Sequence, residues 1–199
     1  MALRRSDFDR LTVATFCVPI ALFFLATLND KAQAGIRYFL PIYPFVFLLC
    51  GAAAAYLWKR GTIFKVLMAV LLAWHAAEAV MVFPHHLAYF NELVGGPKNG
   101  YKYLRDSNLD WGQDLKGLAE FARKKDYPEI VLDYPWPAPP AYYQLAYRTA
   151  RPEEMRMPES AVYAISVHAL DNFEWAKTLK PDAKVGYSIF VYDMRKHGG

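Results

Sequence analysis

Cysteine is almost absent from this sequence of 199 residues and occurs only at positions 17 and 50. Both cysteines lie inside long apolar runs, so neither is placed for a disulfide or for a reactive thiol site. The residues that follow Cys50 contain no further cysteine. We therefore expect the C-terminal half of the chain to be held together by packing, without covalent cross-links.

Charged residues are also scarce. They make up 21% of the sequence, whereas 55% of the residues are hydrophobic and 16% are aromatic. This composition is too apolar for an ordinary soluble protein. From Val94 onward the chain has 15 lysines and arginines against 14 aspartates and glutamates. Such a balance excludes the basic surface that nucleic-acid binding requires, so no nucleic-acid partner is expected.

The apolar residues are concentrated in three runs near the N-terminus. Leu11 to Leu28 covers 18 positions and Phe39 to Trp58 covers 20, both without a charged side chain. With a rise of about 1.5 Å per residue, each run can cross most of a hydrocarbon core about 30 Å thick. A third run, residues 63–83, is interrupted by His75 and Glu78. The sequence therefore predicts a membrane α-helical protein with two or three transmembrane helices.

The distribution of positive charge predicts the orientation of these helices. Five lysines and arginines precede the first run or lie between the second and third runs, and Lys65 stands at the entrance of the third, against two between the first and second. By the positive-inside rule, the N-terminus is cytoplasmic and the chain after the third run lies outside the cytoplasm. A cleavable signal peptide is the alternative for the first run, because residues 32–34 resemble a cleavage site. Asp7 and Asp9 favour a retained anchor instead.

We divide the chain into a transmembrane region, residues 1–93, and an extracytoplasmic domain, residues 94–199. In the second part, apolar residues alternate between helical and strand spacing. The expected helical segments are residues 111–125, 141–147 and 171–179, and the expected strands are residues 129–134, 161–167 and 186–193. Asp110 is a candidate N-cap for the first of these helices. This order favours a small α/β domain with about three strands, parallel in part.

A basic and aromatic motif, GIRYFLPIYP at residues 35–44, stands at the start of the second apolar run. A guanidinium group can hold a lipid phosphate through two charge-assisted hydrogen bonds, which makes Arg37 and Tyr38 candidates for such a contact. The alternative is that both side chains only anchor the helix at the membrane interface. His85 and His86, at the exit of the third run, are expected to be interfacial.

A polar motif, DSNLDWGQD, follows the third run at residues 106–114. Its alternating acidic and amide residues are similar to the start of a calcium loop, but Gly112 comes one place late and Gly117 stands where a bidentate glutamate is needed. We therefore expect no metal. The motif is interpreted either as a tight turn that caps the next helix or as a polar ligand site, with Trp111 as a stacking surface for a sugar.

The run HHLAYFNELVGGPKNGYKYLRDSNLDWGQDLKGL, together with the motif at residues 35–44, resembles the C-terminal end of a known enzyme family. This family comprises bacterial polyprenyl-phosphate-dependent glycosyltransferases, the family 39 or mannosyltransferase-like group with the GT-C membrane fold. The resemblance implies transfer of a sugar from a polyprenyl-phosphate carrier to an acceptor on the outer face of the bacterial inner membrane, without a cofactor. It also implies that Arg37 and Tyr38 lie near the carrier.

The candidate residues for binding sugar or acceptor on the outer face lie within the polar motif at residues 106–114, together with two residues outside it. They are Glu92, Asp106, Asn108, Asp110, Trp111, Gln113, Asp114 and Tyr142.

The chain departs from that family, whose members have many more membrane spans than the two or three expected here. The loop between the first two runs contains the single acid Asp30, whereas the family carries a catalytic acidic motif in its first outer loop. We therefore expect a C-terminal module that has no catalytic residue of its own and needs a multispan partner chain or a missing N-terminal region. The alternatives are a non-catalytic, membrane-anchored saccharide-binding or assembly domain, and a metal-dependent enzyme of the outer face.

Overall fold

The structure, a computed structural model, describes residues 10–28, 35–105 and 108–196. Asp30, the cleavage-like residues 32–34 and Asp106, all named in the sequence analysis, lie outside the described residues. The chain forms two compact units, residues 1–81 and residues 82–199.

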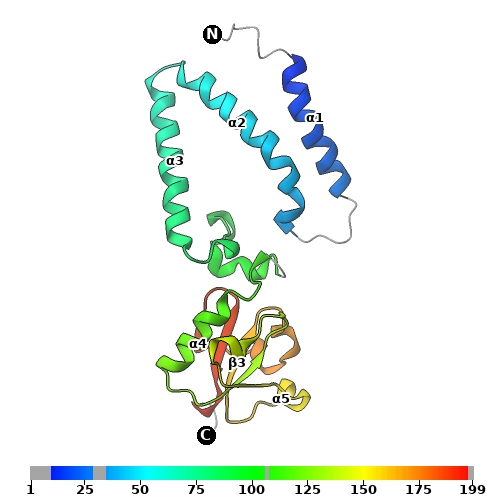
Figure 1. The fold of residues 1–199 in the computed structure, drawn as a ribbon, viewed down its shortest axis with the longest axis vertical. Coiled ribbons are helices and arrows are strands. Elements are labelled where there is room, and N and C mark those ends of the chain that lie inside the picture. Colours follow the sequence, from blue (N-terminus) through cyan, green and yellow to red (C-terminus); the bar gives the residue numbers. More distant parts are fainter. Residues whose placement is uncertain (1–9, 29–34, 106–107, 197–199) are drawn as a thin grey trace. The chain divides into compact units, whose positions relative to one another are not determined.

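The first unit consists of apolar helices (Figure 1). They are α1 (Arg10–Thr27), the 3-10 helix η1 (Gly35–Ile42), α2 (Tyr43–Trp58) and α3 (Thr62–Val82). Two continuous helical segments, Tyr38–Trp58 and Thr62–Val82, are 21 residues each and are long and apolar enough to cross a membrane. The apolar part of the first helix, Val13–Thr27, is shorter. Two of the expected helices are thus confirmed by their length and composition.

The second unit is built on a five-stranded mixed sheet. Its strands are β1 (Ile130–Asp133), β2 (Tyr147–Thr149), β3 (Val162–Ser166), β4 (Ala183–Val185) and β5 (Ile189–Asp193), in the spatial order β2-β1-β3-β5-β4. The first three strands are parallel, and β5 runs antiparallel to both β3 and β4. The predicted α/β class and partly parallel sheet are confirmed.

The expectation of about three strands is wrong, because β2 and β4 were not foreseen. Each has only three residues. Their sequences, YRT and AKV, contain too little apolar alternation to indicate a strand. They are strands because β1 and β5 offer them an edge to pair with. The expected helix at residues 171–179 is instead two 3-10 turns, η7 (Leu170–Asn172) and η8 (Trp175–Lys177).

Alternation along the strands gives the sheet two apolar faces. Ile130 and Leu132 pack with α4 (Asp114–Lys124) on one face, while Val131 packs on the other face with Phe173 beside η7. The helix α4 lies beside the sheet, where it contacts β4 (Figure 1). The unit therefore has a core on both sides of its sheet.

Short elements connect the longer ones. They are η2 (His86–Ala88), η3 (Glu92–Val94), η4 (Pro97–Lys102), η6 (Pro140–Tyr143), α5 (Pro152–Arg156) and η9 (Met194–Lys196).

Candidate functional site

Two buried carboxyl groups form the centre of the candidate site. Asp110 is 0% exposed and Asp114 is 1% exposed. The Tyr134 hydroxyl donates to Asp110 Oδ2 over 2.7 Å, and Ser188 Oγ lies 2.6 Å from Asp110 Oδ2 and 2.7 Å from Asp114 Oδ2. A serine hydroxyl donates one proton only. The Ser188 hydroxyl therefore donates to one of the two carboxyl groups at a time.

The turn before α4 brings these two residues together. Asp110 Oδ1 accepts a hydrogen bond from the Gly112 amide over 2.8 Å. The Gln113 side chain accepts one from the Trp111 amide and donates one to the Leu109 carbonyl. The turn interpretation of the motif is therefore supported. The predicted N-cap role of Asp110 is wrong, because the N-cap is Gln113, which makes no side-chain cap bond.

Asp114, at the start of α4, reaches the loop between β4 and β5 instead of capping its own helix. Its Oδ2 accepts the amides of Tyr187 over 3.1 Å and Ser188 over 3.2 Å. Burial, reinforced by the negative charge of Asp110, raises the pKa of Asp114 despite the hydrogen bond from Ser188. Burial and the neighbouring Asp110 also raise the pKa of Tyr134, so this phenol stays a donor.

Gly186 allows this close approach between α4 and the loop before β5. Its φ is +57°, and an added Cβ would lie 2.1 Å from Asp114 Oδ2. Only glycine fits both the left-handed backbone and the space beside the carboxyl group.

His85 joins the buried carboxyl groups to an open pocket. Its Nδ1 lies 3.0 Å from Asp114 Oδ1, and its ring meets the Tyr187 ring edge to face at 5.4 Å. With Nδ1 bonded to the carboxyl group, Nε2 is the nitrogen left for a ligand. His85 follows the last residue of α3, Val82, by three positions.

The pocket has a volume of about 510 Å³ and is lined by His85, Lys98, Lys184, Gly186 and Tyr187. We call it the basic pocket. The ammonium group of Lys184 lies 4.3 Å from the centre of the Phe190 ring. Burial, followed by the nearby charge of Lys102, lowers the pKa of Lys184. No acidic side chain of the described chain lines the pocket, so its surface attracts anions.

The structure brings together only some of the residues proposed from the sequence. Asp110 and Asp114 form the buried pair, and Asn108 and Gln113 shape the adjoining turn, with Asn108 donating to the Arg105 carbonyl. Glu92 on η3 does not line the pocket.

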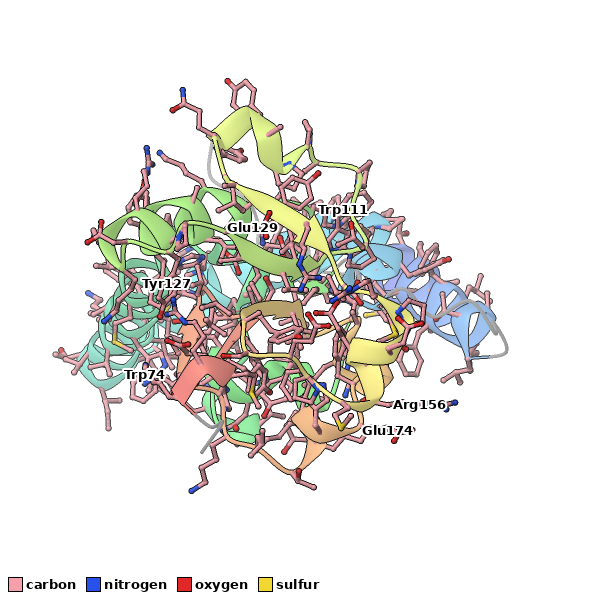
Figure 2. All side chains as sticks on the ribbon, turned by 90° about the horizontal axis from the view of Figure 1, so that it is seen from below. Trp74, Trp111, Tyr127, Glu129, Arg156 and Glu174 are labelled. Atoms are coloured by element: carbon pink, nitrogen blue, oxygen red, sulfur yellow. The ribbon has the colours of Figure 1, made fainter. Side chains whose placement is uncertain are left out.

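The proposed aromatic residues lie apart from the basic pocket. Trp111, labelled in Figure 2, is 55% exposed. Its ring stacks on that of Trp136 with the ring centres 5.3 Å apart. Tyr142 is 79% exposed. Tyr38 and the backbone of Arg37 both lie in η1. The side chain of Arg37 is not among the parts that the structure describes.

The sequence analysis missed the residues that complete the site. His85 was expected at the membrane interface, and Lys98, Tyr134, Lys184 and Ser188 were not selected. Only His85 could have been suggested by the sequence. It lies within a few residues of an apolar helix, in a chain that carries an acidic motif further on.

A metal site is not visible in the parts of the chain that are described, where no three His, Cys, Asp or Glu side chains gather closely enough to hold an ion. The oxygens of Asp110 and Asp114 are occupied by Tyr134, Ser188 and backbone amides.

Comparison with known protein families, with curated proteins and with solved structures finds no match for this chain. Its function is therefore inferred from the side chains of the site.

Proposed function

We propose that this chain is a module of a membrane glycosyltransferase that moves a sugar from a polyprenyl-phosphate carrier to an acceptor, and that its basic pocket holds the phosphate of the carrier. The observation that carries this proposal is the set of three basic side chains, His85, Lys98 and Lys184, around one pocket of about 510 Å³. Ammonium groups and a histidine bind phosphate through charge-assisted hydrogen bonds.

The position of His85 in the chain favours a phosphate attached to a lipid. His85 lies three positions after the end of α3, and three extended residue steps span at most about 11 Å. If α3 crosses the membrane, His85 lies at the depth of lipid head groups. A carrier whose chain lies in the bilayer would present its phosphate at that depth.

The orientation follows from the positive charges. Six lysines and arginines on the predicted cytoplasmic side against two in the other loop favour a sheet domain outside the cytoplasm. This is the side on which the proposed reaction takes place at the bacterial inner membrane. Arg37 and Tyr38, at the start of the second apolar helix, are proposed as further contacts to lipid phosphate.

The buried acidic pair at the basic pocket does not offer a free carboxylate for the chemical step. Glycosyl transfer needs a group that activates the acceptor or stabilises the charge that develops on the sugar. Asp110 and Asp114 are buried and their oxygens already accept hydrogen bonds. We therefore propose that further membrane spans, from a partner chain or from a longer form of this chain, supply the catalytic carboxylate.

The test compares the binding of polyprenyl phosphate and neutral polyprenol to the full chain in lipid nanodiscs. The phosphate is expected to bind more tightly than the alcohol. Lys98→Met and Lys184→Met should each weaken its binding roughly tenfold, because each removes one charge-assisted bond. Methionine retains the apolar stem of each lysine.

Lys124→Met is the matched control, because Lys124 is an exposed residue on α4 that does not line the pocket. It should leave binding unchanged. Equal binding of polyprenyl phosphate and polyprenol, or unchanged binding by a Lys98→Met/Lys184→Met double variant, would refute the proposal.

A further inference from the structure

A second pocket lies at the edge of the sheet, away from the residues that line the basic pocket. Its volume is about 300 Å³. It is lined by the end of β1, the proline-rich loop that follows, and β2. Its lining residues include Asp133, Tyr134, Trp136, Tyr147 and Thr149. We propose that this pocket binds one hexopyranose unit of a saccharide, and we call it the sugar pocket.

The pocket occupies the place where open α/β sheets bind their ligands. Asp133 is the last residue of β1 and Thr149 is the last residue of β2, and these strands are parallel neighbours. Ligands of open α/β sheets bind outside the carboxyl ends of the strands, which is the end of β1 and β2 that lines this pocket.

A carboxyl group without a protein partner lines this pocket. The side chain of Asp133 makes no hydrogen bond or ion pair with any other described residue, although burial raises its pKa. Half-buried carboxyl groups normally find donors within the protein. Sugar hydroxyls are donors that a carboxylate accepts well, often as a vicinal pair.

A rigid aromatic wall lies next to this carboxyl group. The Trp136 ring stacks on Trp111 at an interplanar angle of 20° and meets His168 edge to face at 5.1 Å. Contacts on two sides hold the indole in place, so its ordering costs little when a ligand binds. The C–H faces of a pyranose ring pack against such flat apolar surfaces.

The remaining lining residues favour a neutral polyhydroxy ligand. Tyr147 and Thr149 bring hydroxyl groups, whereas the Tyr134 hydroxyl is already bonded to Asp110. No lysine, arginine or histidine of the described chain lines the pocket, which disfavours phosphates and nucleotides. Small-molecule sites measure about 300 to 1,000 Å³, so this pocket fits a single sugar residue better than a longer ligand.

The sugar pocket goes beyond the proposed carrier site, because it would bind saccharide whether or not the basic pocket holds a lipid phosphate. Its test uses the full chain in lipid nanodiscs and the methyl glycosides of glucose, mannose, galactose and N-acetylglucosamine. Saturation-transfer difference NMR shows which of them binds, and a titration gives the affinity.

At least one glycoside is expected to bind. Asp133→Asn should weaken its binding about tenfold and Thr149→Val about threefold, while Glu120→Gln, an exposed acid on α4 that does not line the pocket, should have no effect. Because Asp133 has no partner among the described residues, its asparagine variant should fold as the wild type does, which the thermal unfolding curve checks.

Binding of polyprenyl phosphate to Asp133→Asn is measured in parallel and should be unchanged, so failure of the sugar pocket and failure of the carrier site are distinguishable. The inference is overturned if none of the four glycosides binds the full chain, or if Asp133→Asn and Thr149→Val both bind as tightly as the wild type.

Discussion

At the scale of single residues, the buried pair Asp110 and Asp114 connects segments that lie far apart in the sequence of the sheet domain. Ser188 reaches both carboxyl groups from the loop before β5, 78 and 74 residues further along the chain. His85 adds a contact from the segment that follows α3. The acidic pair therefore positions His85 at the basic pocket. Because Asp110 and Asp114 are buried, they do not contact a ligand themselves.

Gly186→Ala tests how closely α4 and the β4–β5 loop must approach. The new Cβ would overlap the Asp114 carboxyl group and would sit on a backbone with φ of +57°. We expect a loss of about 2 kcal/mol or more in the free energy of unfolding, measured by denaturant unfolding of the full chain in nanodiscs.

The matched control for this variant is Gly117→Ala in α4, where an added Cβ meets only Val185 Cγ1 at 3.1 Å and where alanine favours the helix. It should change stability much less. Equal stability of Gly186→Ala and the wild type would show that the carboxyl group can move away, and that the site is less fixed than described here.

At the scale of elements, one glutamate connects α5 to two strands. The carboxyl group of Glu154, 1% exposed, accepts two hydrogen bonds from Arg148 of β2 and one from the Tyr163 hydroxyl of β3. The Arg148 hydrogen bonds, with that of the Arg151 amide, lower the pKa of Glu154 to about 2. Burial, together with the Glu154 contact, raises the pKa of Tyr163 to about 12.

This network predicts a loss of stability in acid. A carboxyl group whose pKa falls from 4.5 to about 2 on folding stabilises the folded state fully above the unfolded pKa. That contribution is lost as the pH falls from about 4.5 to about 2 and amounts to something on the order of 3 kcal/mol. Hydrogen exchange of β2 and β3 in the full chain should therefore accelerate across this window.

Glu154→Gln should be less stable at neutral pH and should show a weaker acid dependence in the same strands. Some dependence will remain, because the ion pair with Arg195 also lowers the pKa of Asp193 to about 2. If hydrogen exchange in Glu154→Gln and the wild type depended on pH in the same way, groups other than Glu154 would determine the acid stability of this region.

The elements that could be predicted from the sequence are those with a strong local pattern. The strand runs at residues 130–133, 162–166 and 189–193 are almost entirely apolar, and the two long helices are recognisable from composition. Short strands such as β2 and β4 depend on pairing with a neighbour, which no local pattern records. The pairing of Ser188 with Asp110 likewise depends on the sheet register, so only the acidic half of the site was foreseen.

At the scale of the whole molecule, the two units divide the chemistry between them. The first unit provides helices with the length and composition of membrane spans, and the second provides the basic pocket and the sugar pocket. If the two pockets bind as proposed, one domain carries both the phosphate site and the saccharide site that a sugar attached to a lipid phosphate requires. The central claim is that the basic pocket holds that phosphate.

Photo-crosslinking tests this claim most directly. Polyprenyl phosphate with a diazirine on the isoprene unit nearest the phosphate is bound to the full chain in nanodiscs, and the labelled peptides are identified by mass spectrometry. We expect labels in residues 85–101 and 184–187, removed by excess polyprenyl phosphate but not by polyprenol. Labels confined to residues 10–82, or labels that polyprenol removes equally well, would contradict the account.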